Sequence, residues 1–244
     1  MPRLNSFYLC PQKWTPPFHL DKEESYHFLK VLRGKKGDII RLFDGQGKEG
    51  LFKVKNIQKK QIELECLNIK VHPEPQSKII VGLAWQRANK RDLILEKCVE
   101  LQCWEIIFWP GTYSPPFPKE KKSSWEKKII SAAKQSQNLW IPQIKLYSSL
   151  RDLCSSYDTI ENKIFFWEKE KKNLISNFKF RKDILVIIGP EGGFCPQEYK
   201  FLIEQKFLPI SLGNSILRIE TATIIGLGYL YLSNHSKQLN NKKE

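Results

Sequence analysis

Short apolar runs alternate with longer amphipathic stretches after residue 78, and this alternation is the strongest constraint on the fold. The runs comprise residues 79–85, 106–109, 163–167, 184–188 and 209–212. Continuous apolar runs of this length are typical of strands that are buried on both faces, and such strands form parallel sheets covered by helices. The sequence therefore predicts an α/β domain with a parallel sheet.

The stretches between the runs carry helix signals. Ser123 and Glu126 have the spacing of a capping box, and Pro196 stands where a first helical residue belongs. The last stretch, residues 220–233, is apolar nearly all round. A helix of that kind needs burial on more than one face, which a subunit interface would provide.

The beginning of the chain predicts β-structure. Residues 38–43 form an apolar run that ends in a turn at residues 44–47, where Asp and Gly tolerate positive φ. Residues 51–57 and 61–69 then alternate between apolar and polar side chains, which is the pattern of half-buried strands. Three short strands at this spacing indicate a small barrel.

A proline-punctuated linker at residues 72–77 separates these two patterns. We therefore expect a β-barrel domain of residues 1–72 and an α/β domain of residues 73–244. The beginning of the chain has no basic region followed by an apolar region, and no run approaches the roughly 18 apolar residues that cross a bilayer. A cytoplasmic protein without a membrane partner is expected.

Positive charge is in excess, with a formal net charge of +14 that lies mainly in the first 150 residues. Such an excess favours a polyanionic partner, and no basic amphipathic helix directs it to a membrane. Nucleic acid is therefore the expected partner, and a basic surface kept for solubility is the alternative.

Cysteine and histidine are scattered along the chain. The 6 Cys and 4 His residues include no Cys-x-x-Cys or His-x-x-x-His pair. We expect no metal site, and we expect the thiols to be reduced and buried.

A glycine-rich segment follows the apolar run 184–188. It contains Gly189, Pro190, Glu191, Gly192 and Gly193, which force a tight turn whose backbone can approach a ligand closely. The spacing matches neither of the common phosphate-binding glycine motifs, and a central glutamate would repel a phosphate. The segment predicts a loop for a cationic or hydrogen-bonding ligand, and a purely structural turn is the alternative.

A second loop follows the apolar run 209–212, at the strand end where open α/β sheets bind ligands. Within it, Glu220 and Thr221 could cap the last helix. Arg218 beside them suits either a surface ion pair or a cation that faces an anionic substrate.

Together these two segments, IGPEGGF at residues 188–194 and LGNSILRIETA at residues 212–222, resemble the SPOUT superfamily of trefoil-knotted methyltransferases. Within it, the chain is similar to the bacterial 16S rRNA uridine-N3 methyltransferases, the RsmE family. Further matches over nearly the whole chain are His27-x-x-x-Val31-Leu32-Arg33, Gly37-Asp38, Phe43-Asp44-Gly45, Lys90, Lys97, Glu100-Leu101, Ala132-Ala133, Gln135-Ser136 and Pro142-x-Ile144.

The resemblance implies an N-terminal PUA-like barrel, a C-terminal SPOUT domain with a deep trefoil knot, and a homodimer. It also implies that three knot loops bind S-adenosyl-L-methionine through their backbone. The residues assigned to the cofactor are Phe166, Trp167, Glu168, Ile188, Gly189, Pro190, Glu191, Gly192, Gly193, Leu212, Gly213, Ile216, Leu217 and Arg218.

The implied reaction is methylation of uracil N3 in 16S ribosomal RNA or the small ribosomal subunit. Arg218 is the candidate for stabilising negative charge on the uracil, and Glu191 is the candidate base. The residues assigned to RNA are Arg3, Arg33, Lys53, Lys55 and Lys90.

Two positions depart from the family pattern, because Tyr113 and Asn138 stand where the family usually has arginine. The alternative function is that of a non-catalytic RNA-binding assembly factor that keeps the fold.

Overall fold

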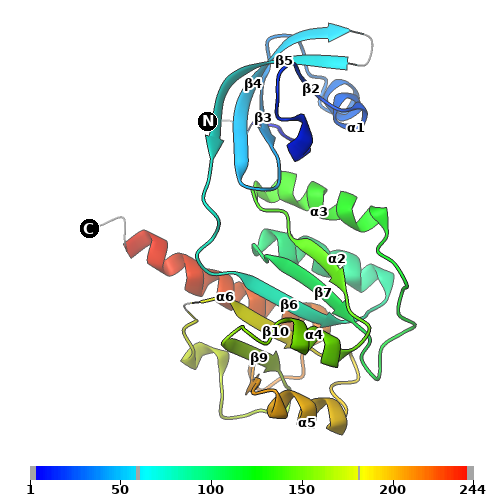
Figure 1. Cartoon of the computed structure of the whole chain (residues 1–244), viewed down its shortest axis with the longest axis vertical. Helices are drawn as coiled ribbons and strands as arrows, with labels where there is room; N and C mark the ends of the chain where they lie inside the picture. Colours follow the sequence, from blue (N-terminus) through cyan, green and yellow to red (C-terminus); the bar gives the residue numbers. More distant parts are fainter. Residues whose placement is uncertain (1–3, 59–60, 181, 241–244) are drawn as a thin grey trace. The chain divides into compact units, whose positions relative to one another are not determined.

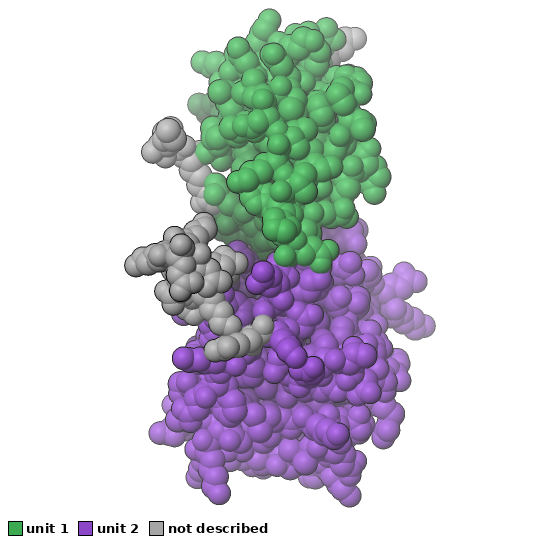
Figure 2. Space-filling view, turned by 60° about the vertical axis from the view of Figure 1, so that its left-hand side comes forward, with its two compact units in different colours: residues 1–74, 130–141 green, residues 75–129, 142–244 purple. Residues whose placement is uncertain are grey.

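Two compact units make up the chain (Figure 2). The computed structural model describes residues 4–58, 61–180 and 182–240, with backbone alone for residues 235–240. Unit 1 consists of residues 1–74 and 130–141, and unit 2 consists of residues 75–129 and 142–244. The sequence predicts a boundary at residue 72, and no pattern in it indicates that residues 130–141 join the first unit.

Unit 1 is a curled sheet around an aromatic and aliphatic core. Its elements are β1 (Ser6–Tyr8), β2 (Phe18–His19), α1 (Lys22–Tyr26), β3 (Ile39–Phe43), β4 (Lys48–Gln58) and β5 (Gln61–Val71). The strand order is β1-β3-β4-β5-β2. On β4, Phe52 and Val54 are buried while Lys53 and Lys55 are exposed, as the alternation predicts. The predicted small β-domain is confirmed.

The second half of β5 departs from its predicted alternation. Leu64 is buried, whereas Cys66 and Asn68 are exposed although they were expected on the same face. The register of β5 against β4 shifts between Cys66 and Asn68, as at a β-bulge, and the exposure of β5 already begins at Glu65, before this shift. The expectation that all thiols are buried is therefore wrong at Cys66, and Cys10 is only half-buried.

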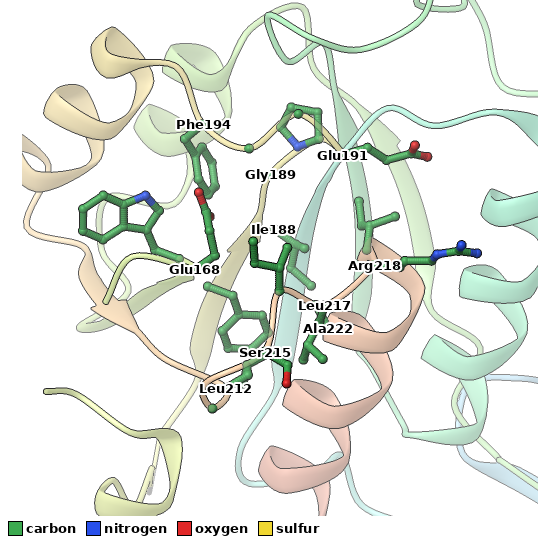
Figure 3. Close-up of a pocket in the computed structure, with 18 of the residues that line it drawn as sticks. Glu168, Ile188, Gly189, Glu191, Phe194, Leu212, Ser215, Leu217, Arg218 and Ala222 are labelled. Carbon is green, nitrogen blue, oxygen red and sulfur yellow. The ribbon is translucent and has the colours of Figure 1, made fainter. Parts of the chain in front are cut away.

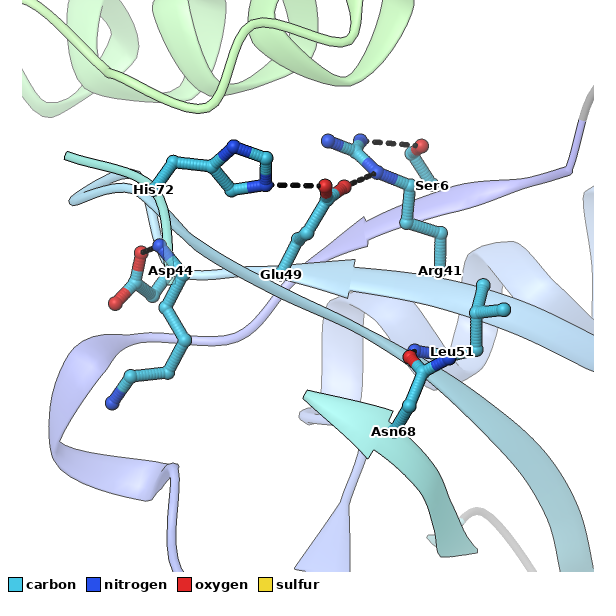
Figure 4. A network of polar contacts seen from close by, with 8 residues as sticks. Ser6, Arg41, Asp44, Glu49, Leu51, Asn68 and His72 are labelled. Atoms are coloured by element: carbon cyan, nitrogen blue, oxygen red, sulfur yellow. Dashed lines mark hydrogen bonds and ion pairs between the residues drawn. The ribbon is translucent and has the colours of Figure 1, made fainter. Parts of the chain in front are cut away.

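A polar network ties three strands of unit 1 together (Figure 4). Arg41 Nε lies 2.7 Å from Glu49 Oε2, and His72 Nε2 lies 2.7 Å from Glu49 Oε1. Arg41 also donates a hydrogen bond to Ser6 Oγ at 3.0 Å. Burial raises the pKa of Glu49, but the hydrogen bonds and charges of Arg41 and His72 outweigh it, so the pKa is lowered overall.

This lowered pKa makes stability depend on pH. The ionised Glu49 stabilises the fold above the ordinary carboxyl pKa of 4.5, and that contribution is lost as pH falls through the lower folded pKa. Glu49→Gln should reduce the free energy of unfolding by about 1–3 kcal/mol at neutral pH. Urea unfolding should show the difference from wild type shrinking below about pH 4. The exposed Glu65→Gln is the control and should change little.

Residues 130–141 join unit 1 through specific contacts. They include the second half of α3 (Ser123–Ser136), where Lys134 Nζ pairs at 2.8 Å with the buried Glu24. Beyond the helix, Gly47 N donates to Leu139 O at 3.2 Å, and Ile141 N donates to Gly45 O at 3.0 Å. Residues 139–141 therefore pair through their backbone with the turn between β3 and β4.

Unit 2 is built on a parallel sheet in the order β11-β9-β10-β6-β7-β8. The strands are β6 (Ile79–Ala84), β7 (Glu105–Trp109), β8 (Gln143–Leu146), β9 (Asn162–Phe166), β10 (Ile184–Ile188) and β11 (Leu208–Ile210). The residues of β6 and β10 are all buried, as continuous apolar runs predict. The predicted parallel α/β domain is confirmed.

Helices cover both faces of this sheet (Figure 1). They are α2 (Ala88–Glu100), α4 (Leu150–Ser156), α5 (Pro196–Glu204) and α6 (Ile219–Asn240). Leu153 of α4 and Leu202 of α5 pack in one core cluster with Ile107 and Ile187 of the sheet. The other face is covered by α6, which packs against α2. No helix in the described part of the chain is long and apolar enough to cross a membrane.

The segment that ends β11 is hydrogen-bonded on both of its sides. Trp167 N donates to Ile210 O at 3.0 Å, so one side of this segment pairs with the end of β9. On its other side, Ser211 N donates to Asn173 O at 2.8 Å and Ile175 N donates to Ser211 O at 3.1 Å. The chain thus passes between the two limbs of the connection that leaves β9. The predicted fold class, an α/β domain with a parallel sheet and a small N-terminal β-domain, is confirmed.

Candidate functional site

A cavity of about 650 Å³ lies at the carboxyl ends of β9, β10 and β11 (Figure 3). Three loops line it, each following one of these strands, and the segment after β11 forms one wall. Parallel strands bring their carboxyl ends to one edge of a sheet, and open α/β sheets bind ligands at that edge. The topology therefore assembles a site from segments that are distant in sequence.

The structure brings together all the residues that the sequence analysis assigns to the cofactor. They are Phe166, Trp167, Glu168, Ile188, Gly189, Pro190, Glu191, Gly192, Gly193, Leu212, Gly213, Ile216, Leu217 and Arg218. The wall also contains Lys90, Phe194, Ser215, Ile219 and Ala222. Lys90 comes from α2, and no local pattern in the sequence signals its place at this cavity.

The loop after β10 is shaped by its glycines. Gly193 has φ +76°, a conformation that side chains rarely adopt, and its N–H donates to Pro190 O at 2.9 Å. At Gly189, a Cβ would lie 2.9 Å from the Phe194 ring. The loop ends in a capping box in which Cys195 and Glu198 bind each other's backbone at the start of α5. The backbone of this loop is therefore held on both sides of Glu191.

The backbone of the loop after β11 is fixed by hydrogen bonds at both of its ends. Gly213 has φ +126°, and its N–H donates to Ser211 Oγ at 3.3 Å. Ala222 N donates to Arg218 O at 2.8 Å, so the helical hydrogen bonding of α6 begins at Arg218. Arg218 is thus fixed at the backbone while its side chain is exposed.

The cavity has an apolar interior and two polar sides. Ile188, Leu212 and Leu217 supply apolar surface, and Glu168 lies at one side. Figure 3 shows Glu191 and Arg218 pointing to the other side, away from Glu168. The charged groups are therefore divided between the two sides, with a cation and a carboxylate together on one of them.

Lys90 forms an ion pair with Glu191 Oε1. Glu191 Oε2 has no hydrogen-bond partner among the described residues. Arg218 likewise makes no ion pair with any residue that the structure describes. One carboxylate oxygen and one guanidinium thus remain available to a ligand on this side of the cavity.

The residues assigned to RNA have different surroundings. Arg3 lies outside the described residues. Arg33 and Lys53 are exposed, and Arg33 has φ 53°. Lys55 is exposed but pairs with Glu63 at 2.7 Å, and Lys90 is paired at the cavity. No three His, Cys, Asp or Glu side chains converge as metal ligands in the part of the chain that the structure describes.

Known families match both units. An RNA methyltransferase domain matches residues 72–231, and an RNA methyltransferase PUA domain matches residues 20–67. The ribosomal RNA small subunit methyltransferase E of Buchnera aphidicola (Acyrthosiphon pisum) is 30% identical over 219 residues, which cover 86% of this chain and 85% of the relative. The chain belongs to the ribosomal RNA small subunit methyltransferase E family. The family member of Bacillus subtilis is 25% identical and covers 87% of this chain and 89% of its own length.

Solved structures agree with this family and with the SPOUT fold. A Legionella pneumophila protein, described as a methyltransferase in complex with bound SAM, is 27% identical with a TM-score of 0.85 and covers 95% of this chain and 98% of its own. A Porphyromonas gingivalis protein, described as an rRNA methyltransferase, is 26% identical with a TM-score of 0.86 and covers 96% and 100%. The family predicted from the two loop motifs is therefore confirmed.

Proposed function

We propose that the protein transfers a methyl group from S-adenosylmethionine to N3 of a uridine in small-subunit ribosomal RNA. The observation that supports it most is the cavity that the three loops form, with Glu191 and Arg218 on the same side. The family to which the chain belongs supports small-subunit rRNA as the substrate. An intact cavity favours this enzyme over a non-catalytic assembly factor.

The cavity fits the cofactor chemically. Its volume of about 650 Å³ lies in the range of cofactor sites, and its apolar interior suits a purine. Glu168 would accept hydrogen bonds from hydroxyl or ammonium groups. Bound there, S-adenosylmethionine would supply a methyl carbon that a positively charged sulfur activates.

The chain's own residues would handle charge and the proton on the uracil. Uracil N3–H is weakly acidic, and its loss leaves negative charge on the two flanking carbonyl oxygens. Arg218 would donate to one of these oxygens and stabilise that charge. The N3 proton would pass to Glu191 Oε2, while Lys90 holds Oε1 and orients the carboxylate. The new bond from N3 to the methyl carbon would replace the bond from that carbon to sulfur, and a neutral thioether would be left.

Two measurements test this function. Calorimetric titration of the purified protein should show binding of S-adenosylmethionine, and the absence of both heat and thermal shift would remove the proposed cofactor. Mass mapping of small-subunit rRNA from cells without the gene should then show one missing methyl group, on uracil N3. If the cofactor binds but all rRNA methyl groups are retained, the substrate is wrong.

Exposed residues of unit 1 would contribute RNA affinity. Arg33 and Lys53 are exposed cations of the curled sheet, and Lys55 adds charge beside its partner Glu63. Contacts between such cations and phosphates release counterions, so RNA affinity should fall as salt rises. Residues 1–72 would thus serve as the RNA-binding domain, and residues 73–244 as the catalytic domain.

A homodimer formed through α6 is also proposed. One face of this helix is buried within the chain, and its side chains are Thr223, Leu227 and Leu230. The opposite face carries apolar side chains that are exposed, with Ile225 44% exposed and Leu232 65% exposed. Apolar side chains on the exposed face of a helix favour a second subunit over solvent.

Light scattering at micromolar concentration should give the mass of two chains, and Ile225→Glu should shift it to one. Ile203→Glu is the matched control, because Ile203 is equally exposed on α5, outside the proposed interface. A monomeric wild-type protein would contradict the dimer.

A further inference from the structure

The connection between β7 and α3, residues 110–122, is attached to the cavity loop and has no role in the function proposed above. Thr112 donates to Glu198 Oε1 through its N–H at 2.8 Å and through its hydroxyl at 3.0 Å. The same carboxylate accepts from Cys195 N at 2.9 Å through Oε2. One glutamate therefore fixes both the start of the connection and the end of the loop after β10.

Tyr113 is the next residue, and its position follows from that attachment. A Cβ on Gly192 would lie 3.0 Å from Tyr113 Cβ and 3.1 Å from its Cγ and Cδ2, so the tyrosine lies directly against the cavity loop. Even so, Tyr113 is 58% exposed. An aromatic ring is thus held in place next to Glu191 with much of its surface available to a ligand.

The connection is fixed a second time before it becomes strongly basic. Phe117 packs edge-on against Trp85, with ring centroids 5.6 Å apart at 80°. Lys119, Lys121 and Lys122 follow, all exposed and without an ion pair to any residue in the described part of the chain. Three exposed lysines thus follow closely after a residue, Phe117, whose ring is fixed by packing.

We propose that residues 112–122 bind the RNA substrate beside the cavity, with Tyr113 stacking on an unpaired base and the three lysines contacting phosphates. This inference rests on the proposed function and names the element that positions its substrate. N3 lies on the edge that uracil uses for pairing, so the target must be unpaired and unstacked before it reacts. Aromatic side chains recover the lost stacking, and cations hold the backbone on either side. Tyr113 is a positioning residue in this arrangement.

Stacking by Tyr113 is tested with two probes and the full-length protein. One probe is a fluorescent oligouridylate of about 12 nucleotides, and the other has the same backbone with abasic riboses. Tyr113→Ala should weaken binding of the oligouridylate about tenfold and leave binding of the abasic probe unchanged. If Tyr113 had only a structural role, Tyr113→Ala would weaken the binding of both probes equally, and that result would overturn the proposal.

Two further substitutions separate stacking from packing. Tyr113→Phe keeps the ring and should restore most of the affinity for oligouridylate. Tyr113→Leu keeps apolar contact with Gly192 but has no ring, so it should bind like Tyr113→Ala. Wild-type affinity in Tyr113→Leu would exclude a stacking platform.

The lysines are tested with a control that the chain itself supplies. Residues 119–122 and residues 169–172 have the same sequence, Lys-Glu-Lys-Lys, and the lysines are exposed in both. Changing the three lysines of residues 119–122 to glutamine should weaken the binding of both probes. The slope of log affinity against log salt concentration should become less steep by about 0.7 for each lost phosphate contact. The same triple change in residues 169–172 should retain the wild-type slope. Equal losses would show that net charge, and not this connection, governs affinity.

Methylation of small subunits separates this inference from the proposed function. In the presence of S-adenosylmethionine, Tyr113→Ala should raise the KM for the subunit and leave cofactor affinity unchanged. An unchanged KM in an active enzyme would refute the platform while the function stands. Lack of cofactor binding in the wild type would refute the function, and the two oligonucleotide probes would still report on the platform.

Discussion

Arg218→Ala is expected to lower the rate of methyl transfer to small subunits by about 10²-fold or more, the usual loss for one donor that stabilises a developing charge. Arg218 lies at the cavity with an exposed side chain that points to the same side as Glu191 (Figure 3). Its backbone carbonyl, not its side chain, starts the hydrogen bonding of α6. Alanine should therefore remove the guanidinium and preserve the helix. Single-turnover kinetics with saturating cofactor would measure the loss.

The control for Arg218 is the affinity for S-adenosylmethionine, which should stay close to that of the wild type. Arg218→Lys keeps the charge but not the planar pair of donors, so its rate should fall between those of wild type and Arg218→Ala. Full turnover in Arg218→Ala would leave Arg218 as a surface residue at the start of the last helix.

Local signals were sufficient for the centre of the fold. The apolar run 184–188 coincides with β10, and Pro196 is the first residue of α5, as predicted. Both depend on short-range chemistry, namely burial of a continuous apolar run and the fixed φ of proline at a helix start. The glycine-rich loop lies between these two elements, so its place at a strand end followed from sequence alone.

Short elements with distant partners could not be predicted in this way. The three residues of β1 pair in parallel with β3, and Ser6 is opposite Arg41. The two residues of β2 pair with β5. Strands of this length have no periodicity to detect, and their stability comes from the partner strand and the core. The attachment of residues 130–141 to unit 1 has the same origin.

The loops of the candidate site could be predicted from the sequence, but the contacts that join these loops to other elements could not. The ion pair between Lys90 and Glu191 joins residues 101 positions apart, and the bond from Thr112 to Glu198 spans 86 positions. Both depend on the strand order, which places the ends of β6, β7 and β10 next to one another. A sequence pattern alone cannot supply that order, so the positions of Lys90 and Tyr113 required the structure.

Gly226→Ala should weaken binding of S-adenosylmethionine about 10- to 100-fold, although alanine normally stabilises a helix by about 1 kcal/mol relative to glycine. A Cβ at Gly226 would lie 2.2 Å from Cε2 and Cζ of Phe166, a buried ring that also lines the cavity. The ring must move to admit the methyl group, and overpacking of this kind costs about 1–3 kcal/mol. Calorimetric titration and thermal unfolding would measure the two effects.

Gly228, two residues further along α6, separates the clash from helix propensity. A Cβ there meets nothing within 4 Å in the chain itself, so Gly228→Ala should leave cofactor affinity unchanged. The pair of variants makes the same chemical change in the same helix, and only one of them reaches Phe166. If Gly226→Ala bound the cofactor as tightly as Gly228→Ala, Phe166 would have room to move without entering the cavity. The assignment of its ring to the cofactor wall would then be wrong.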